Sequence, residues 1–145
     1  MNIGVFASGG DSPGMNAALR SVVRSAIQKG HRVYGIFNGY DGLIQDQIIE
    51  MDLRSVANIV HQGGTIIKSS RSKEFLTSEG REKAYRNTKS KKLSALIGLG
   101  GDGTISGLQK FHEEHPDIDS HEHDKNEGDH GSDDQPDHAS APFPP

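Results

Sequence analysis

The segment Gly100-Gly101-Asp102-Gly103-Thr104 has the residue types and spacing best suited to chemistry in this chain. It follows a short apolar run, residues 96–99, which is typical of a buried strand. The glycines leave backbone N–H groups free to converge on an anion, and a carboxylate at 102 can hold a hard cation beside it. A glycine-rich turn by itself is more often only a turn, but this combination indicates a site for a metal ion and a nucleotide phosphate.

A second glycine-rich loop, residues 8–14, follows a continuous apolar run over residues 2–7. Apolar side chains at helical spacing predict a helix over residues 15–29, and the next apolar run, residues 32–37, predicts the second parallel strand of a βαβ unit. The remaining patterns predict a turn over 38–42, a short helix over 53–60, a brief strand at 66–67, a polar turn over 69–72, a helix over 78–92, a strand over 94–99 and a helix over 104–111.

These elements predict an α/β fold with a doubly wound, mainly parallel sheet. Both glycine loops would then lie at the carboxyl ends of strands, which is the edge where open α/β sheets bind ligands. The predicted helix that starts at Thr104 would also point its N-terminus at the loop of residues 100–103, where the helix dipole favours phosphate.

Composition narrows the class of protein. A net charge of -4 over 145 residues gives no indication of nucleic acid as a partner. Cysteine is absent, which excludes disulfides and thiolate metal sites within these residues and fits a reducing cytoplasm. No apolar stretch is long enough to predict a membrane span, and none predicts a signal peptide.

The last part of the chain, residues 118–145, differs in composition from residues 1–117. Acidic residues and histidine dominate it and apolar residues are few, so burial could not offset the entropy lost on ordering. We expect residues 1–117 to form the folded part and residues 118–145 to be a disordered acidic tail. Three interpretations of the tail stay open: a metal-binding tract rich in His and Asp, a genuine acidic extension, or out-of-frame translation of an interrupted gene.

Four segments together resemble the bacterial ATP-dependent 6-phosphofructokinase family, in the order and spacing typical of it. They are residues 8–16, 34–42, 63–71 and 100–104. The first of them distinguishes this family from the NAD and lipid kinases, which share the Gly-Gly-Asp-Gly-Thr motif. The resemblance implies the transfer of the γ-phosphoryl group of ATP to the 1-hydroxyl of fructose 6-phosphate, a step of glycolysis.

The resemblance also implies that the ATP phosphates lie between the two glycine loops. The nucleotide-binding residues that it implies are Gly10, Tyr40, Arg71, Ser72, Gly101, Asp102, Gly103 and Thr104. Asp102 would hold the Mg²⁺ that accompanies ATP, and Arg71 would neutralise charge in the transition state. Gly103 favours ATP over pyrophosphate, because a carboxylate there would repel the α-phosphate. Ser72 replaces a usually aromatic residue, and Tyr40 could equally be a turn aromatic that caps the core.

An effector site is implied by two arginines on one face of the first helix. Arg20 and Arg24 match family positions that bind ADP or phosphoenolpyruvate between the subunits of a homotetramer. A solvated basic face would give the same pattern. Arg54 lies one position later than a further arginine of that family site.

The chain departs from the family after the helix that begins near Thr104. The family continues with an apolar strand and a Pro-x-Thr-Ile-Asp-Asn-Asp loop that carries the catalytic base, whereas residues 119–130 are polar and we expect no strand there. No catalytic residue is predicted, and we expect no turnover by this chain alone. The alternatives are a non-catalytic nucleotide-binding or regulatory fragment that pairs with a full-length subunit, and a related kinase that acts on NAD or a lipid.

Overall fold

The structure, a computed structural model, describes residues 1–8, 14–60, 62 and 65–124. Within these residues one sheet has the strand order β3-β2-β1-β4-β5. Its parallel strands are β1 (Asn2–Ala7), β2 (Arg32–Ile36), β4 (Ala95–Gly100) and β5 (Asp119–Asp124), and its antiparallel strand is β3 (Ile48–Met51). The helices are α1 (Met15–Gln28), α2 (Gly39–Ile44), α3 (Ser78–Ser90) and α4 (Asp102–Glu114), with two 3-10 turns, η1 (Leu53–Val56) and η2 (Glu74–Leu76).

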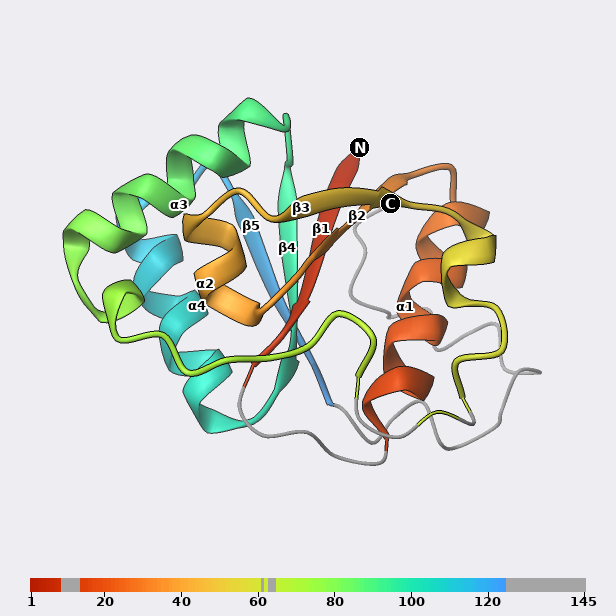
Figure 1. Cartoon of the computed structure of the whole chain (residues 1–145). Coiled ribbons are helices and arrows are strands. Elements are labelled where there is room, and N and C mark those ends of the chain that lie inside the picture. The colour runs from red at the N-terminus through yellow and green to blue at the C-terminus, as the bar shows by residue number, and fades with distance from the viewer. Residues whose placement is uncertain (9–13, 61, 63–64, 125–145) are drawn as a thin grey trace.

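Helices cover both faces of this sheet, which confirms the predicted doubly wound, mainly parallel α/β fold. Figure 1 shows α1 on one side of the strands and α2, α3 and α4 on the other. The βαβ crossover from β1 through α1 to β2 contributes to this arrangement, because the apolar stripe of α1 packs back onto the sheet.

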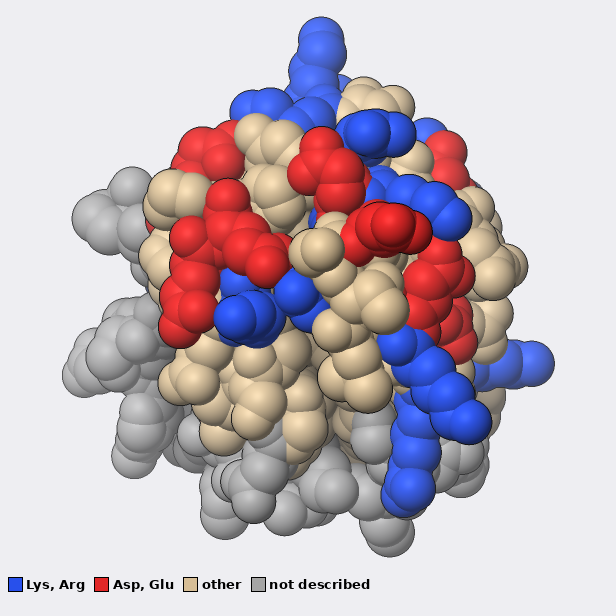
Figure 2. All heavy atoms as spheres, turned by 90° about the vertical axis from the view of Figure 1, so that its left-hand side faces the viewer, with Lys and Arg blue, Asp and Glu red and all other residues tan. Residues whose placement is uncertain are grey.

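The α2, α3 and α4 side of the sheet is closed by aromatic side chains. Phe6 and Leu96 from the sheet pack with Phe75 of η2 and with Phe111 of α4. The rings of Phe75 and Phe111 stack with centroids 5.9 Å apart. The outer surface on this side is strongly charged, and Figure 2 shows acidic and basic side chains interspersed over it.

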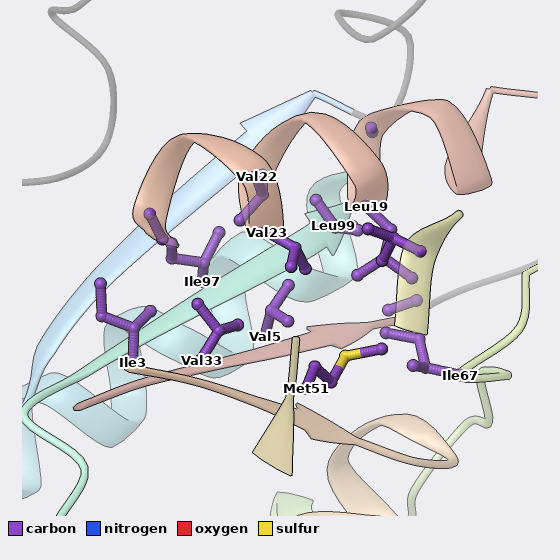
Figure 3. Packing of buried hydrophobic residues seen from close by; sticks show 14 of the residues in the cluster. Ile3, Val5, Leu19, Val22, Val23, Val33, Met51, Ile67, Ile97 and Leu99 are labelled. Carbon is purple, nitrogen blue, oxygen red and sulfur yellow. The ribbon is translucent and has the colours of Figure 1, made fainter. Parts of the chain in front are cut away.

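The other side of the sheet is aliphatic. Figure 3 shows Leu19, Val22 and Val23 of α1 packed over side chains of the central strands. Those strand side chains include Ile3, Val5, Val33, Ile97 and Leu99, and all are buried. Burial of a large aliphatic side chain contributes about 1.5–3 kcal/mol, so this layer fixes α1 relative to β1 and β4.

The predicted turn over residues 38–42 is wrong in part, because the chain there forms the short helix α2. Asn38 and Gly39 have positive φ values of 65° and 61° and make the sharp bend, after which helical geometry continues to Ile44. Gly42 is needed for packing, since a Cβ there would lie 1.6 Å from the carbonyl oxygen of Phe37. Glycines that indicated a turn therefore serve close approach inside a helix.

Two other predicted elements are shorter than expected or absent. The helix expected over 53–60 is only the 3-10 turn η1, because Ala57 is extended and Asn58 has a φ of 61°. The strand expected at 66–67 is a turn, in which the Lys68 amide donates to the Thr65 carbonyl at 3.2 Å. The edge strand β3 was missed, because its antiparallel pairing with β2 leaves only its first and last residues buried.

The expectation of no strand after residue 118 is also wrong. Residues 119–124 form β5, which pairs in parallel with β4 from Ala95↔Asp119 to Gly100↔Asp124. Ile118, 1 % exposed, joins the core beside α4. The open edge of β4 supplies backbone hydrogen bonds that do not depend on apolar side chains, so a polar sequence can continue the sheet. Residues 118–124, expected in the tail, therefore belong to the folded part, and the expected disorder of residues 125–145 concerns residues outside those described.

Candidate functional site

The ends of β1 and β4 lie side by side, and in the sequence each strand leads into a glycine-rich segment. The strands pair with Phe6 opposite Gly98 and Ala7 opposite Leu99. The Ser8 amide continues this ladder and donates to the Leu99 carbonyl at 2.9 Å. Ser8, the last described residue before the first glycine loop, thus lies beside the end of β4, which leads into α4. Gly10 itself lies outside the described residues.

The start of α4 is an open backbone surface. Gly101 and Gly103 are exposed, and a Cβ added at either would meet no atom within 4 Å. Gly101 caps the helix without a side-chain hydrogen bond, and its carbonyl accepts from the amides of Thr104 and Ile105 at 3.0 and 3.2 Å. The earliest amides of a helix have no partner within it, so this terminus can receive an anion. Asp102 is the first residue of α4, and its side chain is outside what the structure describes.

The Thr104 side chain is buried against Gly98 and Gly100 of β4, whereas Gly101 and Gly103 are exposed. It is 1 % exposed, and a Cβ on Gly98 or Gly100 would lie 2.5 Å from its methyl group or 2.2 Å from its hydroxyl oxygen. That hydroxyl has no hydrogen-bond partner among the described residues. The Thr104 side chain therefore packs the helix onto β4, and a contact between Thr104 and a nucleotide stays a prediction.

Arg71 belongs to a polar segment that runs beside α2. Its side chain is exposed and makes no ion pair with the described residues. The neighbouring Ser70 hydroxyl lies 2.6 Å from the Asn38 carbonyl oxygen and 2.8 Å from Oδ2 of Asp41. On the other side, the Ser72 hydroxyl accepts from the Phe75 amide at 3.1 Å and starts η2. A fixed backbone on both sides of Arg71 leaves a free guanidinium that can reach an anion.

Tyr40 connects α2 to the start of α4. It is 5 % exposed, and its hydroxyl donates to the Thr104 carbonyl at 2.7 Å. Its ring stacks on Phe75 with centroids 3.9 Å apart. Burial raises the pKa of the Tyr40 phenol far above its usual value, so the hydroxyl keeps the proton that it donates. A direct contact between Tyr40 and a nucleotide stays a prediction.

The sequence of this chain matches one protein family over most of the described residues. The phosphofructokinase family profile matches residues 2–121, which includes both glycine segments and the Arg71 segment. The chain belongs to the phosphofructokinase family. Its match continues into β5, consistent with the strand that the structure places there.

Individual phosphofructokinases give the same result. The chain is 56 % identical over 109 residues to an ATP-dependent 6-phosphofructokinase of Clostridioides difficile, an alignment that covers 75 % of this chain and 34 % of the relative. It is 53 % identical over 111 residues to one from Alkaliphilus metalliredigens, covering 77 % and 35 %. The structure of Pichia pastoris phosphofructokinase in the T-state superposes with a TM-score of 0.79 at 36 % identity, over 85 % of this chain and 14 % of that one. The chain thus spans about a third of the length of these curated phosphofructokinases.

The arginines predicted for an effector site lie on α1 and η1. Arg24 is exposed and Arg20 is half-buried on α1. Arg54 belongs to η1 and lines a shallow hollow with Ile27 and the Arg32–Glu50 ion pair, and neither Arg20 nor Arg24 lines that hollow. Arg54, which lies one position later in the sequence than the family arginine, thus lines a hollow that Arg20 and Arg24 do not line.

Sequence reasoning missed the role of Asn16, which ties Gln62 and Ile66 to α1 in this phosphofructokinase fold. The side chain is fully buried; its Nδ2 donates to the Gln62 carbonyl at 3.1 Å, and its Oδ1 accepts from the Ile66 amide at 2.9 Å. An Asn on the buried face of an otherwise apolar helix was the available signal, because a buried amide needs partners.

Metal ligands do not converge among the described side chains. Within them no group of three or more His, Asp or Glu could hold a metal ion. Asp102 and His123 are not part of that comparison, since their side chains are not described. The same described residues contain no helix long and apolar enough to cross a membrane.

Proposed function

We propose that this chain is the ATP-binding part of a cytoplasmic 6-phosphofructokinase and binds ATP where β1 and β4 end. One observation supports the proposal: the exposed, glycine-lined start of α4 lies beside the end of β1, since the Ser8 amide donates to the Leu99 carbonyl. Phosphate oxygens there would accept hydrogen bonds from the first amides of α4, and the helix dipole would favour their charge.

The Arg71 segment completes the proposed site. Its guanidinium would hold the terminal phosphates and neutralise charge as the phosphoryl group is transferred. Oxygen ligands suit Mg²⁺, and the open backbone around Asp102 leaves room for a hydrated ion, so the residues present fit this cofactor. Bound Mg²⁺ would supply charge neutralisation across the phosphates.

In the complete enzyme the reaction would transfer the γ-phosphoryl group of ATP to the 1-hydroxyl of fructose 6-phosphate. The described residues would supply positioning and charge for that reaction, and we assign none of them the role of the base that takes the hydroxyl proton. We therefore propose that the chain alone binds ATP and does not turn over. In the same homotetrameric enzyme, Arg20 and Arg24 would bind the phosphate of an ADP or phosphoenolpyruvate effector.

Calorimetric titration with ATP in the presence of Mg²⁺ tests this proposal directly. We expect saturable binding of ATP, weaker binding of pyrophosphate, and a large loss of ATP affinity in Arg71→Ala. Arg86→Ala, which removes an exposed guanidinium of α3, is the matched control and should bind like the wild type. A chain that binds no nucleotide would overturn the proposal, and formation of fructose 1,6-bisphosphate in a coupled assay would overturn the part that denies turnover.

A further inference from the structure

Helix α2 contacts three described segments of the proposed site: the end of β1, the segment before Arg71 and the start of α4. A Cβ at Gly39 would lie 2.8 Å from the Ala7 carbonyl oxygen and 3.2 Å from the Ser70 amide nitrogen. Only glycine allows this approach, because φ at position 39 is also positive. The first turn of α2 therefore touches both the end of β1 and the segment that carries Arg71.

Two sets of hydrogen bonds tie the Arg71 segment to α2. The Asn38 amide donates to the Ile67 carbonyl at 2.9 Å. The Ser70 hydroxyl, with one proton, lies within hydrogen-bond distance of two acceptors, the Asn38 carbonyl at 2.6 Å and the Asp41 carboxylate at 2.8 Å. Ser70 thereby fixes the chain immediately before Arg71.

The contact with α4 is equally close. Tyr40 donates to the Thr104 carbonyl, and a Cβ at Gly107, one turn further along α4, would lie 2.6 Å from the Tyr40 hydroxyl oxygen. Glycine at 107 thus lets the phenol reach the helix backbone. The far end of α2 is held as well, since Asn87 of α3 donates to the carbonyls of Leu43 and Ile44 at 2.9 and 2.8 Å.

We propose that α2 is a positioning element for the nucleotide site: Tyr40 fixes the first turn of α4, Ser70 fixes the Arg71 segment, and their relative placement is set before ATP binds. This inference rests on the proposed function for the identity of the ligand. A site ordered in advance loses less entropy on binding, so contacts that do not touch the ligand still raise its affinity. Tyr40 is in this role a positioning residue.

Tyr40→Phe and Ser70→Ala test the two contacts. Phenylalanine keeps the stack on Phe75 and removes only the hydroxyl. Tyr85→Phe is the matched control, because it removes one tyrosine hydroxyl bond elsewhere, to Asp117 Oδ2 at 2.8 Å. In the free protein, amide hydrogen exchange of the first two turns of α4 should become about fivefold faster in Tyr40→Phe, the factor expected for one ordinary hydrogen bond. Exchange in β1 and β4 should not change, and Tyr85→Phe should leave α4 exchange as in the wild type.

Affinity for ATP with Mg²⁺ is the second measurement, made where every variant is fully folded. Tyr40→Phe and Ser70→Ala should each bind about fivefold more weakly, and Tyr85→Phe like the wild type. Unchanged α4 exchange in Tyr40→Phe would overturn the inference, and so would faster exchange with unchanged ATP affinity, because the contact would then be structural only. A wild-type chain that binds no ATP would reject the proposed function, and the exchange comparison would still decide whether Tyr40 orders α4.

Discussion

Arg81 and Glu114 form a two-pronged ion pair that joins α3 to the last turn of α4. The distances are 2.7 Å from Nε to Oε1 and 3.0 Å from Nη2 to Oε2. Arg81, with a side chain only 8 % exposed, also donates to the Phe75 carbonyl at 3.0 Å. All three nitrogens of the Arg81 guanidinium thus have a hydrogen-bond partner. Glu114 is the only one of these partners that carries a charge, so we expect it to be important for stability.

Removing that partner should destabilise the fold. Glu114→Ala leaves the Arg81 charge buried without its carboxylate, and we expect a loss of about 2 kcal/mol in the free energy of unfolding. Lys83→Ala is the control, because its pair with Glu74 at 2.9 Å is exposed and such pairs contribute less than about 1 kcal/mol. Urea unfolding followed by circular dichroism measures both, and equal losses would show that the Arg81 pair is no stronger than a surface pair.

The same pair should make stability depend on pH. The hydrogen bond from Arg81 lowers the pKa of the Glu114 carboxyl below its usual value. A lowered folded-state pKa stabilises the fold above the unfolded-state pKa, and this contribution disappears as pH falls through the folded-state pKa. The wild type should therefore exceed Glu114→Gln in stability at neutral pH, and the difference should shrink below about pH 4. A difference that stays constant down to pH 2 would contradict this.

The parts of the fold that were predictable from sequence are those whose apolar pattern matches their burial. β4 is buried throughout and β1 is buried from Ile3 onward, as their apolar runs predict, and α1 has a clear apolar stripe. β5 could not be found in this way, because Asp119, Ser120 and His121 form a strand through the backbone of β4. This strand depends on pairing with β4, which is distant in the sequence, whereas the polarity of its own residues predicted that no strand would form.

The sequence predicted the exposed glycines of the candidate site, but it did not predict the residues that hold the neighbouring segments in place. Gly101 and Gly103 are open, as a phosphate-binding segment requires. Thr104, expected among the binding groups, has its side chain packed against the sheet. The roles of Ser70 and Asn16 depend on contacts with residues 29 and 50 positions away, which no local motif encodes.

Ser120 in β5 should be a site where an apolar residue stabilises the fold. It pairs with Leu96, and its hydroxyl is buried without a hydrogen-bond partner among the described residues. Ser120→Val removes the unsatisfied hydroxyl and adds a β-branched side chain suited to a strand, so we expect a gain of about 1 kcal/mol.

Thermal unfolding followed by circular dichroism is the measurement for this change. Ser94→Val is its control, because Ser94 is exposed immediately before β4, and it should shift stability by less than about 0.5 kcal/mol. A lower unfolding temperature for Ser120→Val would mean that the hydroxyl has a partner in the folded protein.

Charge at position 103 should decide how well the site accepts ATP. Gly103 is exposed with open space around it, so Gly103→Asp and Gly103→Asn should both fold with nearly wild-type stability. The two side chains have the same shape, and only the carboxylate repels phosphate. We expect Gly103→Asp to bind ATP about tenfold more weakly than Gly103→Asn at low salt, and this ratio should fall as added salt screens the repulsion. Calorimetric titrations at two salt concentrations measure it. Equal affinities for the two variants would place the ATP phosphates away from the start of α4.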